Sequence, residues 1–218
     1  MAKTVNSRRT YSSPLRDGQA AATRHRVLDS AWELFTTRGY VATTVGRVAM
    51  LAEVSVDTLY TTVGRKPELL RAVVESAISG TDDTVPAEQR DYVKRMRATP
   101  GATEKIRVYA EAVAAMSPRT APVFVALRDA AHTDEDCAAL FTEITDRRAA
   151  NMLTLAADLR TTGELRRELS DRYVADVVWA TAGFEHYMQL VAGRGWRPEE
   201  FGEYLRELWG RLFLAGDG

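Results

Sequence analysis

The sequence predicts an all-α protein with a small N-terminal three-helix unit and a larger C-terminal helical domain. From Thr103 onward, apolar residues recur at the spacing of a helix, and no segment alternates apolar and polar residues as a strand would. The candidate breaks between helices fall at Gly, Pro, Ser and Thr. Hydrophobic residues make up 45% and charged residues 27% of the 218 residues, which is typical of a globular protein with one or two cores.

The first residues are expected to form a disordered arm followed by one helix. Residues 1–18 hold almost no apolar side chains and carry four cations, so we expect them to be unfolded. This basic arm is suited to DNA phosphates or the minor groove, and a solvated tail explains its composition equally well. Gln19–Arg38 follows as a helix with one apolar stripe, and Gly39 ends it.

The stretch from Thr43 to Leu70 predicts two short helices joined by a tight turn. Thr44 and Ser55 precede the two helices, where a hydroxyl group caps a helix well, and Glu53 lies in the turn. The second helix is short and has too few apolar residues for a core helix, so most of its surface should face out. A short exposed helix with small polar and aromatic residues fits the major groove of DNA.

The distribution of charge supports an anionic partner for the N-terminal third. Residues 1–66 contain ten Lys and Arg against five Asp and Glu, a net charge of +5. Residues 67–218 contain nineteen against twenty-five, a net charge of −6. A basic third on an acidic body favours contact with a polyanion such as DNA, although charge alone does not distinguish this from a chance surface bias.

Four short motifs in this stretch resemble the helix-turn-helix signature of the tetracycline-repressor (TetR) family. They are Thr43-Thr44-Val45, Val54-Ser55-Val56, Thr58-Leu59-Tyr60 and Lys66-x-x-Leu69-Leu70. The rest of the chain is similar to the family only in layout and in its last two helices. The resemblance implies a cytoplasmic, ligand-responsive repressor that binds a near-palindromic double-stranded DNA operator as a homodimer. The family usually has Gly where this chain has Glu53, so we expect Glu53 at positive φ.

The resemblance also assigns DNA contacts to residues in and around the two short helices. Contacts to base edges or methyl groups are expected from Val56, Asp57, Tyr60 and Thr62. Phosphate contacts are expected from Thr44, Ser55, Tyr60, Arg65 and Lys66, and Thr58 is suited to either kind of contact.

The remaining helices follow from periodicity and from the breaks between them. Pro67–Ser79 is expected to link the small unit to the rest, and residues 80–101 to be a loose connection with one short helix inside it. This divides the chain into a DNA-binding domain at 19–66 and an effector-binding and dimerisation domain at 67–218. The later helices are expected at 103–116, 121–131, 134–161, 170–192 and 198–214, with one break at Ser117-Pro118.

Two sets of residues in the larger domain are candidates for an interface and a pocket. The last two helices carry wide apolar stripes, which favour a four-helix interface between two protomers, with an internal hairpin as the alternative. The interface set is Val174, Val178, Thr181, Phe201, Leu205, Leu208 and Leu212. The resemblance implies an unknown small-molecule effector in this domain, although large residues at helical spacing are more often core. The pocket set is Tyr109, Met116, Phe124, Arg128, Asn151, Met152, Trp179 and Phe184.

Other classes of function receive little support from the sequence. The single cysteine, Cys137, fits a core position better than a redox site, and Asp134 beside it is better explained as a helix cap than as a metal ligand. We expect no cofactor, no metal, no catalytic residues and no membrane partner, since nucleotide and hydrolase motifs are absent and apolar runs are short. The main alternative is a helical ligand-binding or interaction protein with a degenerate helix-turn-helix. The second alternative is an enzyme whose active site uses the cavity of the predicted pocket residues.

Overall fold

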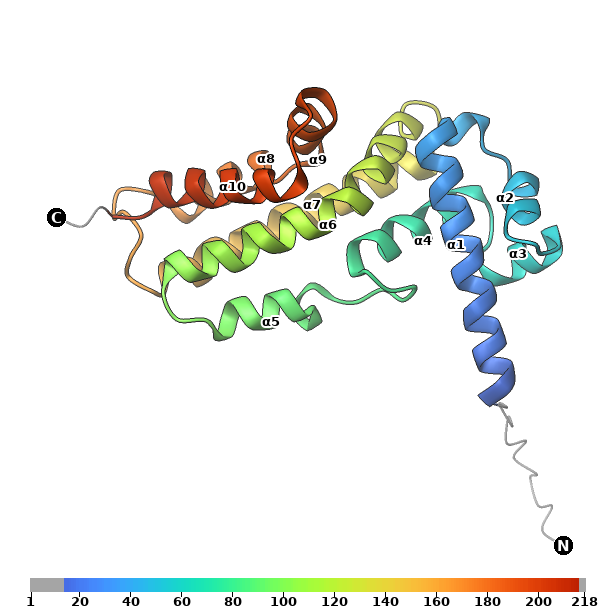
Figure 1. The fold of residues 1–218 in the computed structure, drawn as a ribbon, viewed down its shortest axis with the longest axis horizontal. Helices are drawn as coiled ribbons and strands as arrows, with labels where there is room; N and C mark the ends of the chain where they lie inside the picture. Colours follow the sequence, from blue (N-terminus) through green and yellow to red (C-terminus); the bar gives the residue numbers. More distant parts are fainter. Residues whose placement is uncertain (1–13, 216–218) are drawn as a thin grey trace, which may run out of the picture.

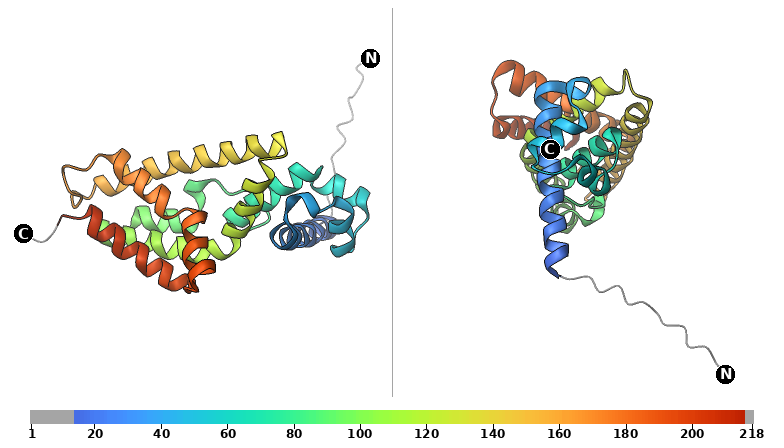
Figure 2. Two further views of the ribbon diagram at one scale, coloured as in Figure 1. Left: turned by 90° about the horizontal axis from the view of Figure 1, so that it is seen from above. Right: turned by 90° about the vertical axis from the view of Figure 1, so that its right-hand side faces the viewer.

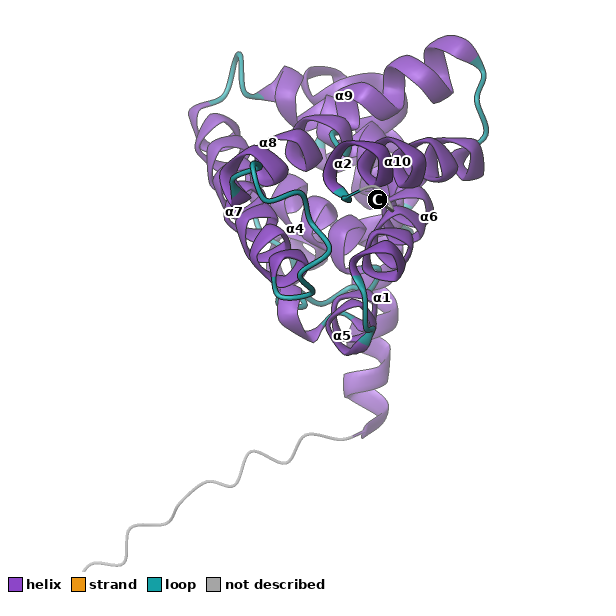
Figure 3. Ribbon diagram, turned by 90° about the vertical axis from the view of Figure 1, so that its left-hand side faces the viewer, coloured by secondary structure: helices purple, strands orange, loops and turns teal. Residues whose placement is uncertain are grey.

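The structure is a computed structural model that describes residues 14–215, and all its regular elements are helical (Figure 3). One isolated bridge pairs Leu165 with Leu214. The all-α prediction is therefore confirmed. The α-helices are α1 (Pro14–Ala42), α2 (Val45–Leu51), α3 (Val56–Thr62), α4 (Lys66–Ser79), α5 (Asp91–Ala98), α6 (Ala102–Ala130), α7 (Glu135–Arg160), α8 (Asp171–Thr181), α9 (Phe184–Tyr187) and α10 (Pro198–Phe213). The short helical segments η1 (Ala87–Gln89) and η2 (Met188–Ala192) complete the set.

The molecule is elongated, with the three-helix unit of α1, α2 and α3 at one end (Figures 1 and 2). The two long helices α6 and α7 run through the body, where α8 packs on α7 and α10 packs on α6. Helix α4 contacts α1, α6 and α7, so it joins the small unit to the body. Along residues 14–215, no helix combines the length and apolar character that crossing a membrane requires.

The buried apolar residues form two clusters. The first joins α1–α4 to the end of α6 and the start of α7, and it includes Phe35, Leu59, Leu70 and Leu127. The second fills the body and centres on α6, α7, α8 and α10. Packing is therefore continuous across the domain boundary predicted at residue 66, because α4 buries its apolar face in the same cluster as α1–α3.

Helix α1 begins earlier than the sequence predicts. It starts at Pro14, and a proline suits a first turn because the missing N–H has no partner there anyway. Residues 1–13 of the predicted basic arm lie outside the described residues, and residues 14–18 belong to α1. Gly39 ends the regular helix as expected, since its backbone is at φ 78°.

Helix α6 passes through the position where the sequence predicts a break. The predicted break at Ser117-Pro118 is wrong, and Pro122 also lies inside the helix. Ser117 Oγ donates to the Val113 carbonyl at 2.7 Å, and the ring of Pro118 is exposed to solvent. The helix instead changes direction in this region, as prolines inside a helix cause (Figure 1).

The predicted helix 170–192 is interrupted after Thr181. Gly183 has an extended backbone and precedes the short helix α9. A Cβ atom on Gly183 would lie 3.1 Å from the Ala180 carbonyl oxygen, so the missing side chain allows the chain to turn tightly here. The expected short helix in the connection 80–101 is present as α5, and Met96 buries it against the second cluster.

Candidate nucleic-acid interface and effector cavity

Helices α2 and α3 form the predicted helix-turn-helix with both predicted caps. Thr44 Oγ1 accepts from the Arg47 N–H at 3.2 Å, and Ser55 Oγ accepts from the Thr58 N–H at 3.0 Å. Each cap residue has an extended backbone, as an N-cap requires. Glu53 in the turn is at φ 57°, so the expectation of positive φ is correct, and a side chain there carries a steric cost.

Helix α3 has one buried anchor and an exposed outer surface. Leu59 is fully buried on the platform of α1 and α2. Val56 is 41% and Tyr60 47% exposed, which is unusual for large apolar side chains. Asp57 and Thr58 are also exposed, whereas Thr62 is half-buried. Four of the five α3 residues assigned to DNA therefore present their side chains to solvent.

The residues assigned to phosphate contacts lie in different environments. Thr44, Ser55 and Arg65 are exposed, and Glu68 accepts from the Arg65 N–H at 2.6 Å. Lys66 is half-buried, with its ammonium group 4.0 Å from the centre of the Tyr40 ring. Burial lowers the pKa of Lys66 although the Asp134 carboxylate lies nearby. In this conformation Lys66 lies over Tyr40 of α1 and near Asp134 at the start of α7.

Two exposed arginines near the helix-turn-helix are missing from the predicted DNA-contact set. Arg47 lies in the first turn of α2, and its guanidinium donates to the Ala42 carbonyl at 3.1 Å. Arg26 of α1 donates to the Ala52 carbonyl at 3.2 Å. The positive charge of Arg47 next to the helix cap Thr44 was a signal in the sequence that points to phosphate contacts, whereas Arg26 lies inside α1 and carried no such signal.

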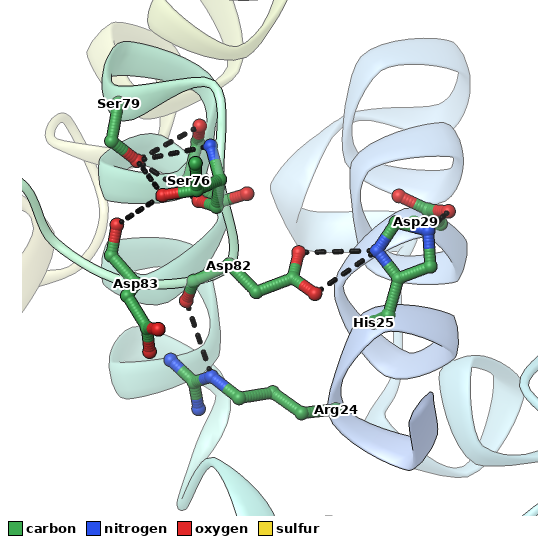
Figure 4. Close-up of polar contacts among 8 residues, drawn as sticks. Arg24, His25, Asp29, Ser76, Ser79, Asp82 and Asp83 are labelled. Atoms are coloured by element: carbon green, nitrogen blue, oxygen red, sulfur yellow. Dashed lines mark hydrogen bonds and ion pairs between the residues drawn. The ribbon is translucent and has the colours of Figure 1, made fainter. Parts of the chain in front are cut away.

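A group of polar contacts ties α1 to the end of α3 and to the loop after α4. Figure 4 shows the contacts with the loop. Arg24 donates to the carbonyl oxygens of Thr62 and Asp82, each at 3.3 Å. His25 contacts the Asp82 carboxylate at 3.0 Å and the Asp29 carboxylate at 3.2 Å. The hydrogen bond to Asp82, together with the charges of Asp29 and Asp82, raises the pKa of His25. We call these four residues, Arg24, His25, Asp29 and Asp82, the α1 clamp.

A second polar link joins the small unit to α7. The Tyr40 hydroxyl donates to Asp134 Oδ2 at 2.7 Å, while Asp134 Oδ1 accepts from the Cys137 N–H at 3.1 Å. The hydrogen bond from Tyr40 holds the pKa of Asp134 below its usual value. Burial raises the pKa of the Cys137 thiol to about 11, so the thiol stays protonated at neutral pH and is a core residue. The described residues contain no cluster that could hold a metal ion.

The body encloses a cavity of about 460 Å³ between α4, α5, α6, α7 and the end of α8. Seven of the eight predicted pocket residues line it, namely Tyr109, Met116, Phe124, Asn151, Met152, Trp179 and Phe184. Arg128 lies outside the lining, with its guanidinium over the Phe184 ring and 3.1 Å from the Asp129 carboxylate. Ile78 of α4 also lines the cavity, so a ligand there would touch the helix that leads to the DNA-binding unit.

The residues predicted for a dimer interface fall into two groups. Val174, Val178, Phe201 and Leu205 are at most 1% exposed within the single chain, so they build its internal core. Leu208, Leu212 and Thr181 are half-buried and remain accessible in part. Thr181 also accepts a hydrogen bond from the Trp209 indole at 2.8 Å.

These features define a class of fold: a helix-turn-helix unit joined to a helical body that contains a ligand-sized cavity. Residues 27–73 match the model of the family "Bacterial regulatory proteins, tetR family". The N-terminal unit is therefore a tetR-family DNA-binding domain, and the regulators of this family are DNA-binding proteins rather than enzymes.

Several solved structures share the fold of the whole chain. NalD, the secondary repressor of the MexAB-OprM multidrug efflux pump in Pseudomonas aeruginosa, is 17% identical with a TM-score of 0.68, covering 92% of this chain and 100% of its own. The regulator FadR from Bacillus subtilis in complex with stearoyl-CoA is 16% identical with a TM-score of 0.68, covering 85% and 96%. The SmeT–triclosan complex is 18% identical with a TM-score of 0.68, covering 90% and 93%. The curated proteins contain no match to this chain.

Proposed function

We propose that this protein is a cytoplasmic, ligand-responsive transcriptional repressor that binds a near-palindromic operator as a homodimer. The observation that carries the proposal is a continuous path of contacts from the exposed helix α3 to the cavity. Leu59 of α3 packs in the first apolar cluster together with α4, and Ile78 of α4 lines the cavity. An occupant of the cavity therefore touches the element on which the DNA-binding unit rests.

The DNA-binding step follows from the shape of the small unit. In a two-fold dimer, the two copies of α3 would enter successive major grooves about 34–36 Å apart. Val56, Asp57 and Tyr60 are exposed on α3 and face outward to read base edges. Thr44 and Arg47 are exposed at the start of α2, which supports phosphate contacts from both.

The effector step is supported by the cavity and by the structures with the same fold. FadR with stearoyl-CoA and SmeT with triclosan are complexes with small molecules. A cavity of about 460 Å³ lined by apolar and aromatic side chains together with polar and charged ones has the size and composition of a small-molecule site. We infer that an effector shifts α4 and thereby changes the spacing of the two recognition helices.

The dimer is proposed to form through the outer faces of α8 and α10. Leu208 and Leu212 are half-buried on α10, and Tyr173 of α8 is 46% exposed. Leu208→Glu would place an unpaired charge in that contact and is expected to give monomers and to abolish operator binding. Sedimentation velocity reports the first effect. If this variant remains a dimer, the interface lies elsewhere. Glu207→Gln, on the exposed side of α10, is the matched control.

The test of the whole proposal is a pair of titrations on the full-length protein. Operator found by selection from random duplexes is titrated with and without an effector found in a metabolite screen. Coupling is reciprocal, so operator should weaken effector binding by the factor with which effector weakens operator binding, typically 5- to 150-fold. Equal effector affinities with and without operator would remove the allosteric step. Duplex binding without a steep salt dependence would favour the degenerate helix-turn-helix instead.

A further inference from the structure

The wall of the cavity carries four arginines among its apolar and aromatic side chains: Arg90, Arg97, Arg147 and Arg148. Arg147 is neutralised from outside the lining, because its guanidinium lies 2.6 Å from the Glu75 carboxylate of α4. The cavity carboxylate of Asp158 is neutralised in the same way by the buried Lys105 at 2.7 Å. These two ion pairs are complete without a ligand.

Within the described residues, no ion pair holds Arg148, Arg90 or Arg97, and among these three only Arg148 lies over an aromatic ring of the cavity wall. Its guanidinium lies 5.2 Å from the centre of the Trp179 ring and donates to the Trp179 carbonyl oxygen. Glu185 is the one carboxylate whose charge acts on the pKa of Arg148, and that side chain is exposed. Arg148 is half-buried, and this burial lowers its pKa. A cation in such a place is stabilised by any anion that enters the cavity.

The cavity wall offers both hydrogen-bond donors and apolar surface to a ligand. Asn151 follows Arg148 by three residues on α7, so both side chains lie on one face of the helix and both line the cavity. Met116 and Phe124 line it from α6, and the Phe124 ring stacks on Phe184 with centroids 5.6 Å apart. One part of the wall therefore offers hydrogen-bond donors, and another offers apolar and aromatic surface.

We propose that the effector is an organic acid with an apolar body, whose carboxylate binds Arg148 and Asn151. This inference rests on the proposed function, because it names the ligand of the same cavity. A guanidinium presents paired N–H donors that match a carboxylate, and the apolar body occupies the space beside Met116 and Phe124. A neutral ligand of the same shape leaves Arg148 without a counter-ion. Arg90 and Arg97 add positive charge at the cavity, opposed by the exposed Glu88 and Glu185.

The experiment compares two matched pairs of probes by isothermal titration at pH 7.5. The pairs are decanoate with decan-1-ol, and 4-phenylbutyrate with 4-phenylbutan-1-ol, so each pair differs only in the charged group. Wild-type protein is expected to bind the acid of at least one pair about tenfold or more tightly than its alcohol, the size of a charge-assisted contact. Arg148→Met should reduce this preference below about threefold, and Arg148→Lys should keep part of it. Arg172→Met, an exposed arginine of α8 outside the cavity, should leave it unchanged.

Each outcome has a defined consequence. Equal affinity for acid and alcohol in both pairs, or no binding of either, overturns the inference. An acid preference that survives in a folded Arg148→Met protein overturns the role of Arg148. Where circular dichroism shows that Arg148→Met is unfolded, the wild-type preference and its partial retention in Arg148→Lys decide the matter. Operator binding without ligand is measured in parallel. Wild-type protein that binds operator but shows no preference for the acids contradicts this inference alone.

Discussion

The two apolar clusters of this protein differ in what they support: the first holds the exposed helix α3, and the second forms the core of the body. The first supports α3 through fully buried residues such as Phe35 and Leu59, and it presents its helices to solvent as a fixed platform. The second fills the body around Trp209 and Phe201. The cavity lies where the two meet, because Ile78 and Phe124 pack on the first cluster while Tyr109 and Met152 belong to the second.

This position suggests how a ligand would act. A molecule that fills the cavity adds contacts between the two clusters without entering either of them. The polar links between the small unit and the rest, through the α1 clamp and through Tyr40 and Asp134, lie outside the cavity lining. We expect a ligand to bias the relative placement of the clusters, which requires different affinities for the two arrangements.

The largest expected effect is a difference in stability between two truncations, one of a side chain in the first cluster and one of a side chain in the cavity wall. Leu59→Ala removes a fully buried anchor and should lower the free energy of unfolding by about 2–5 kcal/mol. Met116→Ala removes a half-buried side chain that already borders empty space, so its cost should be less than about half of that. Urea denaturation of both variants measures the difference. Equal costs would mean that the cavity wall is packed as tightly as the platform.

The second prediction concerns the outer surface of the platform. Tyr60 is 47% exposed and is not needed for packing, so Tyr60→Ala should leave the unfolding free energy within about 0.5 kcal/mol of wild type. It should weaken operator binding by about 1–3 kcal/mol, the range of single recognition contacts. Fluorescence anisotropy with labelled operator measures this. Thr61→Ala, a neighbouring exposed position outside the predicted contact set, serves as the control, and unchanged affinity in folded Tyr60→Ala would contradict the docking of α3.

The platform was more predictable from sequence than the cavity because its signals are local. A hydroxyl residue before a helix, as at Thr44 and Ser55, and a glycine after one, as at Gly39, act through the backbone of their own segment. The wrongly predicted break at Ser117-Pro118 shows the limit of such signals. Packing of α6 against α7 and α10 holds that helix together, and this packing has no local signature.

The cavity residues show a second limit. Their positions depend on which face of each helix turns inward, and that is decided by neighbours far away in the sequence. Seven predicted residues lie on the wall, whereas Arg128, on the same helix as Phe124, turns away to pair with Asp129. The sequence did not predict Arg148 as a pocket residue because charged residues are usually solvated. Only the tertiary arrangement places it beside Trp179.

The smallest expected effect tests the α1 clamp, which joins the two parts at the surface. His25 of α1 is faced by Asp29 on its own helix and by Asp82 in the loop after α4, and Arg24 and Arg119 are the nearby cations. Its pKa is raised in the folded protein above the ordinary value of 6.5, so the protonated form binds its partners more strongly. The resulting stabilisation is fully present below pH 6.5 and declines as the pH rises through the folded pKa.

His25→Asn should therefore lower the free energy of unfolding at pH 5.5 by less than about 1 kcal/mol, as expected for exposed ion pairs, and by a still smaller amount at pH 8.5. The quantity to measure is the difference between wild type and variant across this range, since other groups titrate equally in both proteins. Asp82→Asn should reproduce most of the change, because the hydrogen bond to Asp82 is the main cause of the raised pKa. A difference that is constant with pH, or that grows toward pH 8.5, would show that the clamp does not depend on a protonated His25.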